Sequence, residues 1–251
     1  MPDLKELSRP DGETIAYMAR AGKAPGVVWL GGFKSEMSGT KASALHAWAA
    51  RKGHAFLRFD YFGHGRSSGD FRMGTISRWR EDALTVLDNL TEGPQILVGS
   101  SMGGWLALLA ALARPEKVAG MLLIAPAADF TEELLWARLP EDARRLIVEK
   151  GEWLRPSAYD PDPYPITRGL IEDGRKHLVM GAPIRLSFPV RIVQGMKDPD
   201  VPWEHALKLT QSIEGDVTLT LVKQGDHRLS TPDDIRLIEQ MLDGLVMERT
   251  E

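Results

Sequence analysis

The sequence predicts an α/β fold in which helices cover both faces of a mostly parallel sheet. Short apolar runs alternate along the chain with longer stretches of helical composition. This alternation is typical of parallel sheets, whose strands are buried on both faces. The chain has 251 residues, of which 43% are hydrophobic and 26% are charged. This length and this ordinary globular composition predict a single domain, residues 1–251.

Local patterns predict the strands and helices in chain order. Two strand-like runs around the turn residues 9–12 predict a hairpin of residues 4–8 and 14–19. Short apolar runs bounded by turn residues predict buried strands at 27–30, 55–59, 96–98, 118–124 and 190–194, and an alternating run predicts a last strand at 217–222. Helical composition predicts helices at 37–52, 76–90, 105–113, 205–213 and 232–247. Gly53 fits the end of the first helix, and Ser230 or Thr231 fits the start of the last.

The alternation of strands and helices breaks between residues 127 and 188. Two amphipathic stretches, 131–137 and 141–150, precede a segment that contains Pro156, Pro161, Pro163 and Pro165. About 60 residues with this many prolines are a poor candidate for a second hydrophobic core. We therefore expect an insertion that forms a cap or lid over the carboxyl edge of the sheet.

The apolar run 96–98 leads into Gly99-Ser100-Ser101-Met102-Gly103, a Gly-x-Ser-x-Gly turn, and then into the helical stretch 105–113. Strand, turn and helix in this order are typical of a nucleophile elbow. Gly99 and Gly103 lack a Cβ atom, so strand and helix can approach closely around a strained serine. We predict that Ser101 is a nucleophile and that the Met102 backbone N–H stabilises an oxyanion. A glycine-rich turn without chemistry is the alternative.

A serine hydroxyl is a weak nucleophile, so it needs a histidine base, and the base needs an acid that orients it. Asp198 is the predicted acid because it follows the strand 190–194, where a parallel sheet places ligand-contacting loops. Asp200, two residues further, is its rival. His227 is the predicted base, because it follows the last strand in a loop that a glycine begins.

A second oxyanion donor is expected from the loop after strand 27–30. Gly31-Gly32-Phe33 would place the Phe33 N–H there. His64 lies in the glycine-rich loop 60–69, and we expect it to be a loop-packing residue.

The composition excludes several other classes of function. The net charge is −4 and the basic residues are scattered, which disfavours nucleic acid as a partner. The chain has no cysteine, and its histidines lack the paired spacing of a zinc site. Gly63-x-Gly65 lacks the third glycine of a dinucleotide loop. We therefore expect no metal and no cofactor. No signal peptide is visible and no run of about 18 apolar residues occurs, so we expect a cytoplasmic protein without stable membrane insertion.

The insertion carries the residues that could select a substrate. Its apolar side chains are expected either to pack against the core or to line an acyl pocket: Leu134, Leu135, Trp136, Leu139, Leu146, Ile147, Trp153 and Leu154. Its basic side chains could attract a substrate that bears a carboxylate or could form a solvated face: Arg138, Arg144, Arg145, Arg168, Arg175 and Lys176.

Four stretches together resemble the serine α/β-hydrolase superfamily: Asp60-x-x-Gly63-x-Gly65-x-Ser67, Gly99-x-Ser101-x-Gly103, Gly195-x-x-Asp198 with Val201-Pro202, and Gly225-Asp226-His227. Residues 37–42, 53–56, 93–101, 113–118 and 195–203 are similar to the α/β-hydrolase domain-containing protein 10 group, which comprises acyl-protein thioesterases and acyl-glucuronide esterases.

This resemblance implies an α/β-hydrolase fold with a mostly parallel eight-stranded sheet and a helical lid insertion at about 127–188. It also implies a serine hydrolase of ester or thioester bonds with Ser101, Asp198 and His227 as its triad. The substrate would be a small-molecule ester or an acylated protein. A C–C bond or peptide hydrolase with the same triad is the alternative, and a non-catalytic binding protein of this fold is a further one.

Overall fold

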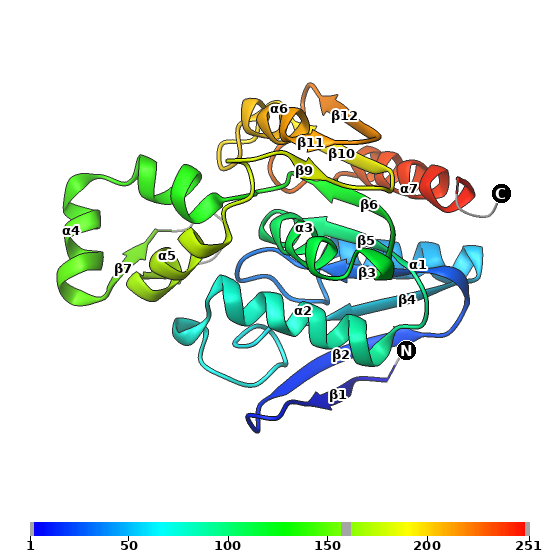
Figure 1. Cartoon of the computed structure of the whole chain (residues 1–251), viewed down its shortest axis with the longest axis horizontal. Helices are drawn as coiled ribbons and strands as arrows, with labels where there is room; N and C mark the ends of the chain where they lie inside the picture. Colours follow the sequence, from blue (N-terminus) through cyan, green and yellow to red (C-terminus); the bar gives the residue numbers. More distant parts are fainter. Residues whose placement is uncertain (1–2, 157–161, 249–251) are drawn as a thin grey trace.

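The computed structural model describes residues 3–156 and 162–248, so Pro161 of the proline-rich segment lies outside the described residues. The predicted fold class is confirmed by an eight-stranded sheet at the centre of the molecule (Figure 1). Its strands in chain order are β1 (Lys5–Ser8), β2 (Thr14–Arg20), β3 (Lys23–Leu30), β4 (His54–Phe59), β5 (Gln95–Ser100), β6 (Val118–Ile124), β10 (Val190–Gly195) and β12 (Val217–Val222).

The strands lie in the spatial order β1-β2-β4-β3-β5-β6-β10-β12. β1 and β2 form the expected antiparallel hairpin, and β2 pairs antiparallel with β4. Every pairing from β4 to β12 is parallel. The carboxyl ends of β3, β5, β10 and β12 therefore meet at one edge of the sheet, which is the edge where such sheets bind ligands.

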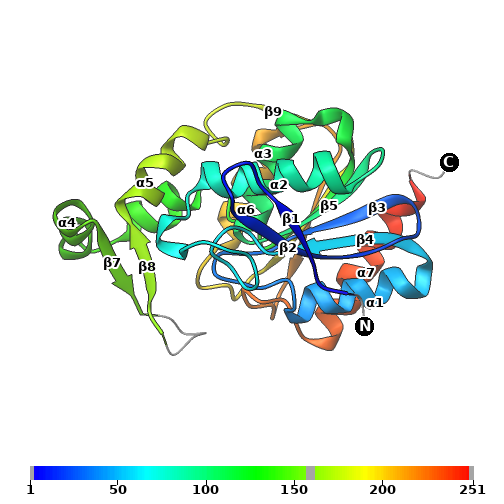
Figure 2. The ribbon, with the colours of Figure 1, turned by 90° about the horizontal axis from the view of Figure 1, so that it is seen from below.

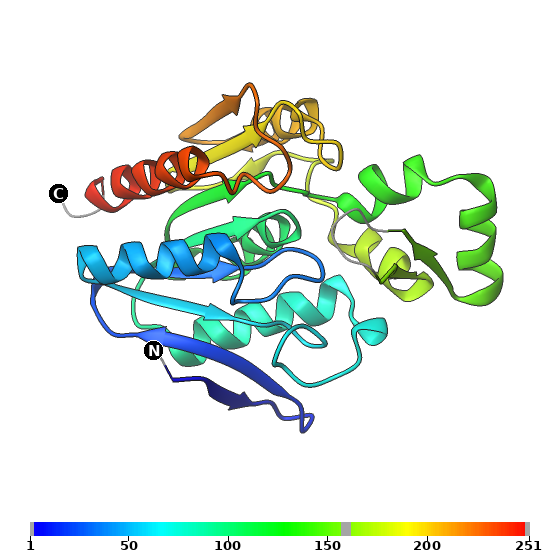
Figure 3. The same ribbon diagram turned by 180° about the vertical axis from the view of Figure 1, so that it is seen from behind.

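Helices cover both faces of the sheet, as Figure 3 shows from behind. They are α1 (Thr40–Lys52), α2 (Ile76–Leu90), α3 (Met102–Ala113), α6 (Trp203–Ser212) and α7 (Pro232–Met247). Alternate residues of β5 enter two different cores: Leu97 packs in the core that contains α2 and α3, whereas Ile96 and Val98 pack in the core that contains α1 and α7. This two-sided burial explains why the central strands are continuous apolar runs.

The helix ends follow their capping residues. Gly53 ends α1 with a φ of 80°, and its N–H donates to the carbonyl of Ala49. Thr231, not Ser230, caps α7, because the Thr231 side chain accepts from the N–H of Asp234 in a capping box. The first helix begins at Thr40 rather than at residue 37. The N–H of Met37 instead donates to the Asp60 carboxylate at 2.6 Å, which keeps this segment in a loop.

Residues 127–188 form an insertion between β6 and β10 that extends beyond the carboxyl edge of the sheet (Figure 1). Its elements are η3 (Thr131–Leu135), η4 (Trp136–Arg138), α4 (Glu141–Lys150), β7 (Glu152–Arg155), β8 (Tyr164–Thr167), α5 (Arg168–Gly174), η5 (Arg175–His177) and β9 (Ile184–Arg185). β9 pairs with β11 (Ile213–Glu214). Two short 3-10 turns, η1 (Phe71–Met73) and η2 (Pro115–Lys117), lie outside the insertion.

The insertion is not purely helical, because β7 and β8 form an antiparallel hairpin beside α4 and α5 (Figure 2). Four-residue strands are too short to show a clear alternation, and prolines in this segment predict a loop. Pro165 is tolerated opposite Leu154 because both strands of a two-stranded ribbon are edge strands.

Two buried carboxylates hold the insertion in place. Asp129 accepts from the N–H groups of Val179 and Met180 at 2.8 and 2.9 Å, so it ties the outgoing and returning segments of the insertion to each other. Asp173 on α5 accepts from the backbone N–H and the hydroxyl of Ser77 at the start of α2. Within the described ranges, no helix is long and apolar enough to cross a membrane.

Candidate active site

The turn between β5 and α3 holds Ser101 in a strained backbone conformation. Ser101 has a φ of 55° and a ψ of −121°, values that side-chain-bearing residues seldom adopt. A Cβ atom on Gly99 would lie 2.4 Å from the carbonyl oxygen of Gly103. A Cβ atom on Gly103 would lie 2.1 Å from the carbonyl oxygen of Leu30. Both glycines are therefore required, and the predicted elbow geometry is confirmed.

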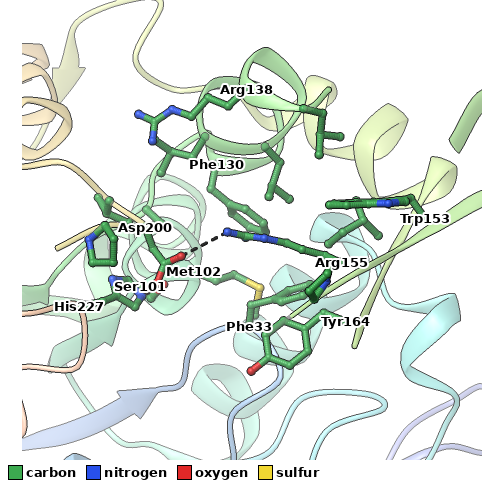
Figure 4. Close-up of a pocket in the computed structure, with 18 of the residues that line it drawn as sticks. Phe33, Ser101, Met102, Phe130, Arg138, Trp153, Arg155, Tyr164, Asp200 and His227 are labelled. Carbon is green, nitrogen blue, oxygen red and sulfur yellow. Dashed lines mark hydrogen bonds and ion pairs between the residues drawn. The ribbon is translucent and has the colours of Figure 1, made fainter. Parts of the chain in front are cut away.

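Three loops at the carboxyl edge bring the predicted acid, base and nucleophile together. Figure 4 shows the base, His227, beside Ser101. His227, after β12, lies with Nε2 3.0 Å from the Ser101 hydroxyl oxygen. The His227 Nδ1 atom lies 2.7 Å from an oxygen of Asp198, which follows β10. The imidazole thus bridges the hydroxyl and the carboxylate, which is the geometry that general-base activation of a serine requires.

The Asp198 carboxylate accepts from three N–H groups and faces the His227 ring. One oxygen accepts from the backbone N–H groups of Asp200 and Val201 at 2.9 and 2.8 Å. The other accepts from the Gln194 amide at 3.0 Å and faces His227. The Asp198 side chain is 0% exposed, so these donors replace the water that the charge has lost.

Asp200, the rival acid, does not occupy this position. Its carboxylate pairs with Arg155 of the insertion at 3.3 Å, while its backbone N–H supports Asp198. The carboxylate that contacts His227 Nδ1, at 2.7 Å, is therefore that of Asp198.

In the described part of the chain, Asp198, Asp200 and His227 offer potential metal-ligand atoms within 4.8 Å of one another. The lone pairs of Asp198 are already used by N–H donors. This set therefore does not fit a cation, which would have to displace those hydrogen bonds.

The loop that carries His227 is fixed from two sides. The Asp226 side chain accepts from the backbone N–H groups of Arg228 and Leu229 at 3.0 Å each. Lys41 on α1 donates to the carbonyl of Arg228. Burial lowers the pKa of Lys41 to about 8. These contacts restrict the backbone on the carboxyl side of the base.

The two predicted oxyanion donors are placed beside Ser101. Met102 is the first residue of α3, where a backbone N–H has no acceptor within the helix. Phe33 follows β3, and both residues line the same cavity as Ser101 and His227. The role of these two N–H groups as oxyanion donors stays a prediction.

The loop that contains Phe33 is held by the glycine-rich loop 60–69. The N–H of the next residue, Lys34, donates to His64 Nε2 at 3.1 Å. His64 is 4% exposed and packs against the rings of Tyr61, Phe71 and Trp79, so the expected loop-packing role is confirmed. Burial lowers the pKa of His64 to about 4. The hydrogen bond to Lys34 is the feature that the sequence pattern does not reveal.

A cavity of about 590 Å³ opens above Ser101, with a lining that is mostly apolar. Four of the apolar insertion residues singled out in the sequence line it: Leu134, Leu135, Leu139 and Trp153. By contrast, Leu146 and Leu154 are exposed, and Ile147 is buried in the core. Of the basic insertion residues that we singled out, Arg138 lines the cavity.

Sequence patterns missed Arg155 and Tyr164, which face the cavity from the hairpin β7–β8 (Figure 4). Arg155 lies two residues after Trp153, so the two side chains share one face of a strand. That spacing is the pattern that could have revealed Arg155.

Comparisons with known proteins agree with this fold. The family model described as serine aminopeptidase, S33, matches residues 26–168. The chain is 43% identical to the palmitoyl-protein thioesterase ABHD10, mitochondrial, of Mus musculus, over 97% of this chain and 82% of that protein. The solved structure of alpha/beta hydrolase domain-containing protein 10 from mouse matches with a TM-score of 0.91 and 42% identity, covering 98% of this chain and 99% of that one. A hydrolase from Agrobacterium vitis S4 matches with a TM-score of 0.94 and 44% identity over 98% and 99% of the two chains.

The fold and these similarities define a serine hydrolase that cleaves ester or thioester bonds of acylated substrates. Within the α/β-hydrolase superfamily, the chain belongs to the α/β-hydrolase domain-containing protein 10 group.

The expected cytoplasmic location is wrong. The curated relatives that are 40–43% identical to this chain are named as mitochondrial proteins. That expectation rested on the lack of a visible signal peptide. Neither the composition nor the folded domain encodes a cellular compartment, so neither could support it.

The lowered pKa of His64 predicts how stability depends on pH. Between pH 7 and pH 4 the unfolded chain protonates His64 while the folded protein resists, so stability is lost as pH falls. Relative to a His64→Gln variant, the wild type should lose about 3 kcal/mol of unfolding free energy over this range. Urea unfolding at several pH values measures this difference. Parallel curves for the two proteins would contradict the assignment.

Proposed function

We propose that this protein removes long fatty acyl groups from cysteine thioesters of proteins, through an acyl-enzyme on Ser101. The observation that carries the proposal is the position of His227. Its imidazole contacts the Ser101 hydroxyl at 3.0 Å and Asp198 at 2.7 Å, directly beside the apolar cavity. The similarity to proteins named palmitoyl-protein thioesterase supports this substrate class.

The reaction follows from the contacts of the three side chains. His227 Nε2 takes the hydroxyl proton as the Ser101 oxygen attacks the carbonyl carbon of the thioester. The backbone N–H groups of Phe33 and Met102 stabilise the oxyanion that forms. His227 then gives its proton to the leaving thiolate, and the carbonyl re-forms as an acyl-serine. A water molecule, deprotonated by the same histidine, attacks the acyl-serine; the bond to the Ser101 oxygen breaks, His227 returns its proton to that oxygen, and the fatty acid is released. Asp198 holds the imidazole orientation throughout and stabilises its charged form.

The cavity favours an apolar acyl group. Its volume of about 590 Å³ lies within the range of small-molecule pockets. Phe130 lines it from the connection after β6, and Leu135 and Trp153 line it from the insertion. We propose that residues 127–188 act as a lid within a single domain, because they supply much of this wall.

An ester that carries a carboxylate, such as an acyl glucuronide, is the second candidate substrate. The guanidinium groups of Arg138 and Arg155 face the cavity (Figure 4). A carboxylate can accept paired hydrogen bonds from a guanidinium group. The observation that favours this candidate is that two guanidinium groups occur in a mostly apolar lining, in which Asp200 pairs with one of them, that of Arg155.

Peptide hydrolysis, the alternative, is less well supported. An aminopeptidase must bind the cationic amino terminus of its substrate with an acidic group. Among the described cavity residues, the carboxylate of Asp200 is already paired with Arg155. No described feature of the cavity favours a substrate in which a C–C bond would be cleaved.

Hydrolysis of a palmitoyl-cysteine peptide, a neutral p-nitrophenyl ester series and an acyl glucuronide tests the proposal. We expect the palmitoyl thioester and the long-chain esters to be preferred. Ser101→Ala should lower kcat by a factor on the order of 10⁴ or more and abolish labelling by a fluorophosphonate. Undiminished turnover by Ser101→Ala would refute the mechanism. A preference for the glucuronide would favour the second candidate, and a preference for a peptide substrate would favour the alternative.

The two neighbouring aspartates provide a matched pair of variants. Asp198→Asn removes the charge that stabilises the imidazolium, so kcat should fall by a factor on the order of 10³ to 10⁴. Asp200→Asn keeps the backbone N–H that supports Asp198 and should lower kcat far less. Steady-state kinetics on the same thioester measures both. Equal losses would contradict the assignment of Asp198 as the acid.

Arg155 should discriminate between anionic and neutral substrates. Arg155→Met removes a guanidinium from the cavity wall, so kcat/KM for the glucuronide should fall about tenfold relative to a neutral ester of equal chain length. Arg144→Met is the control, because Arg144 bonds to the Trp136 carbonyl and does not line the cavity. An unchanged ratio in Arg155→Met would remove the support for an anionic substrate.

A further inference from the structure

The glycine-rich loop 60–69 contacts the loop of the proposed oxyanion hole at two points. The Asp60 carboxylate accepts from the N–H of Met37 at 2.6 Å. The His64 ring accepts from the N–H of Lys34 at 3.1 Å. No residue of the glycine-rich loop 60–69 lines the cavity above Ser101. These contacts therefore act on the site through the backbone of residues 33–37.

The His64 contacts determine which ring nitrogen carries the proton. The Nδ1 atom lies 3.1 Å from the carbonyl oxygen of Phe62, which can only accept a hydrogen bond. Nδ1 is therefore protonated, and the neutral ring presents a lone pair on Nε2 to Lys34. Burial lowers the His64 pKa to about 4, so this neutral form persists at neutral pH. At neutral pH the His64 ring can therefore accept the hydrogen bond from the Lys34 N–H.

Lys34 needs this support because its backbone is strained. Its φ of 54° lies in the left-handed region, which residues with a side chain adopt only when their surroundings impose it. The hydrogen bond from its N–H fixes the peptide plane between Phe33 and Lys34. Without an acceptor at this point, the segment is free to relax toward an ordinary conformation.

The same aromatic cluster fixes the side chain of Phe33. Its ring packs edge-on against Phe71 and Trp79, with ring centres 5.0 and 5.8 Å away. His64 packs against these same two rings at 5.0 and 5.2 Å. His64 thus constrains Phe33 in two ways. Its hydrogen bond to the Lys34 N–H holds the backbone that follows Phe33, and the rings of Phe71 and Trp79 contact both side chains.

We propose that His64 is a positioning residue that holds the Phe33 backbone N–H in place for the oxyanion. The inference rests on the proposed function, since the orientation of this N–H matters for catalysis only if an oxyanion forms at Ser101. Misplacement of a reacting group by about 1 Å costs up to about 100-fold in rate. The effect of His64 should therefore fall on kcat rather than on substrate binding.

The test compares His64→Leu with His64→Gln on the palmitoyl thioester. Leucine removes the acceptor, and we expect kcat to fall by about 10- to 100-fold with little change in KM. The Gln side-chain oxygen can replace Nε2 as the acceptor, so His64→Gln should recover most of kcat. His46→Leu is the matched control, because His46, on α1, packs against Phe56 of β4 and does not line the cavity. It should leave kcat unchanged.

Three outcomes would overturn the proposal: an unchanged kcat in His64→Leu, a loss confined to KM, or equal losses in the leucine and glutamine variants. Thermal melting of each variant separates loss of folded protein from loss of rate, and kcat is calculated per folded molecule. The Ser101→Ala variant shows whether a negative result concerns only the positioning role of His64 or the proposed function as well. If Ser101→Ala is inactive while His64→Leu is fully active, the positioning role alone is wrong.

Discussion

The left-handed backbone of Ser101 is the constraint on which the site depends. Such a conformation costs about 1–3 kcal/mol and persists only where the surroundings impose it. Here the Ser101 N–H donates to the Ile124 carbonyl at 2.9 Å. Gly99 lets β5 approach α3, and Gly103 lets α3 approach the end of β3, too closely for any side chain at either position. The folding of the sheet therefore stabilises the strained turn. Because parallel strands end at one edge, the loops that carry Asp198 and His227 meet the same turn.

The proposed triad and the cavity come from different parts of the chain. Loops of the central sheet supply Ser101, Asp198 and His227, whereas described residues of the insertion supply much of the apolar wall. The two parts are joined where Arg155 of the hairpin pairs with Asp200, whose backbone N–H supports the Asp198 carboxylate. The insertion is thereby connected to the acid by a short path of polar contacts. This division predicts that changes in the insertion alter the choice of substrate more than the chemistry.

Sequence patterns located the residues at strand ends and missed those that depend on distant pairing. Ser101 and His227 were identifiable because a strand and glycines precede each one, and Asp198 because it closely follows β10. Arg155 was missed because β7 becomes a strand only by pairing with β8, across a segment rich in prolines. The bond between His64 and Lys34 joins residues 30 positions apart, and no local pattern encodes it. The start of α1 was misplaced for a similar reason, since the distant carboxylate of Asp60 holds Met37 in a loop.

Charge and burial explain why the site needs so many supporting groups. The Asp198 side chain is fully buried, so its oxygens need hydrogen-bond donors in place of water. The Gln194 amide and the N–H groups of Asp200 and Val201 supply these donors, and one carboxylate oxygen faces His227. His64 is buried as well, and its burial favours the neutral ring that can accept from Lys34. In both cases hydrogen bonds inside the fold fix the position of a polar side chain close to Ser101.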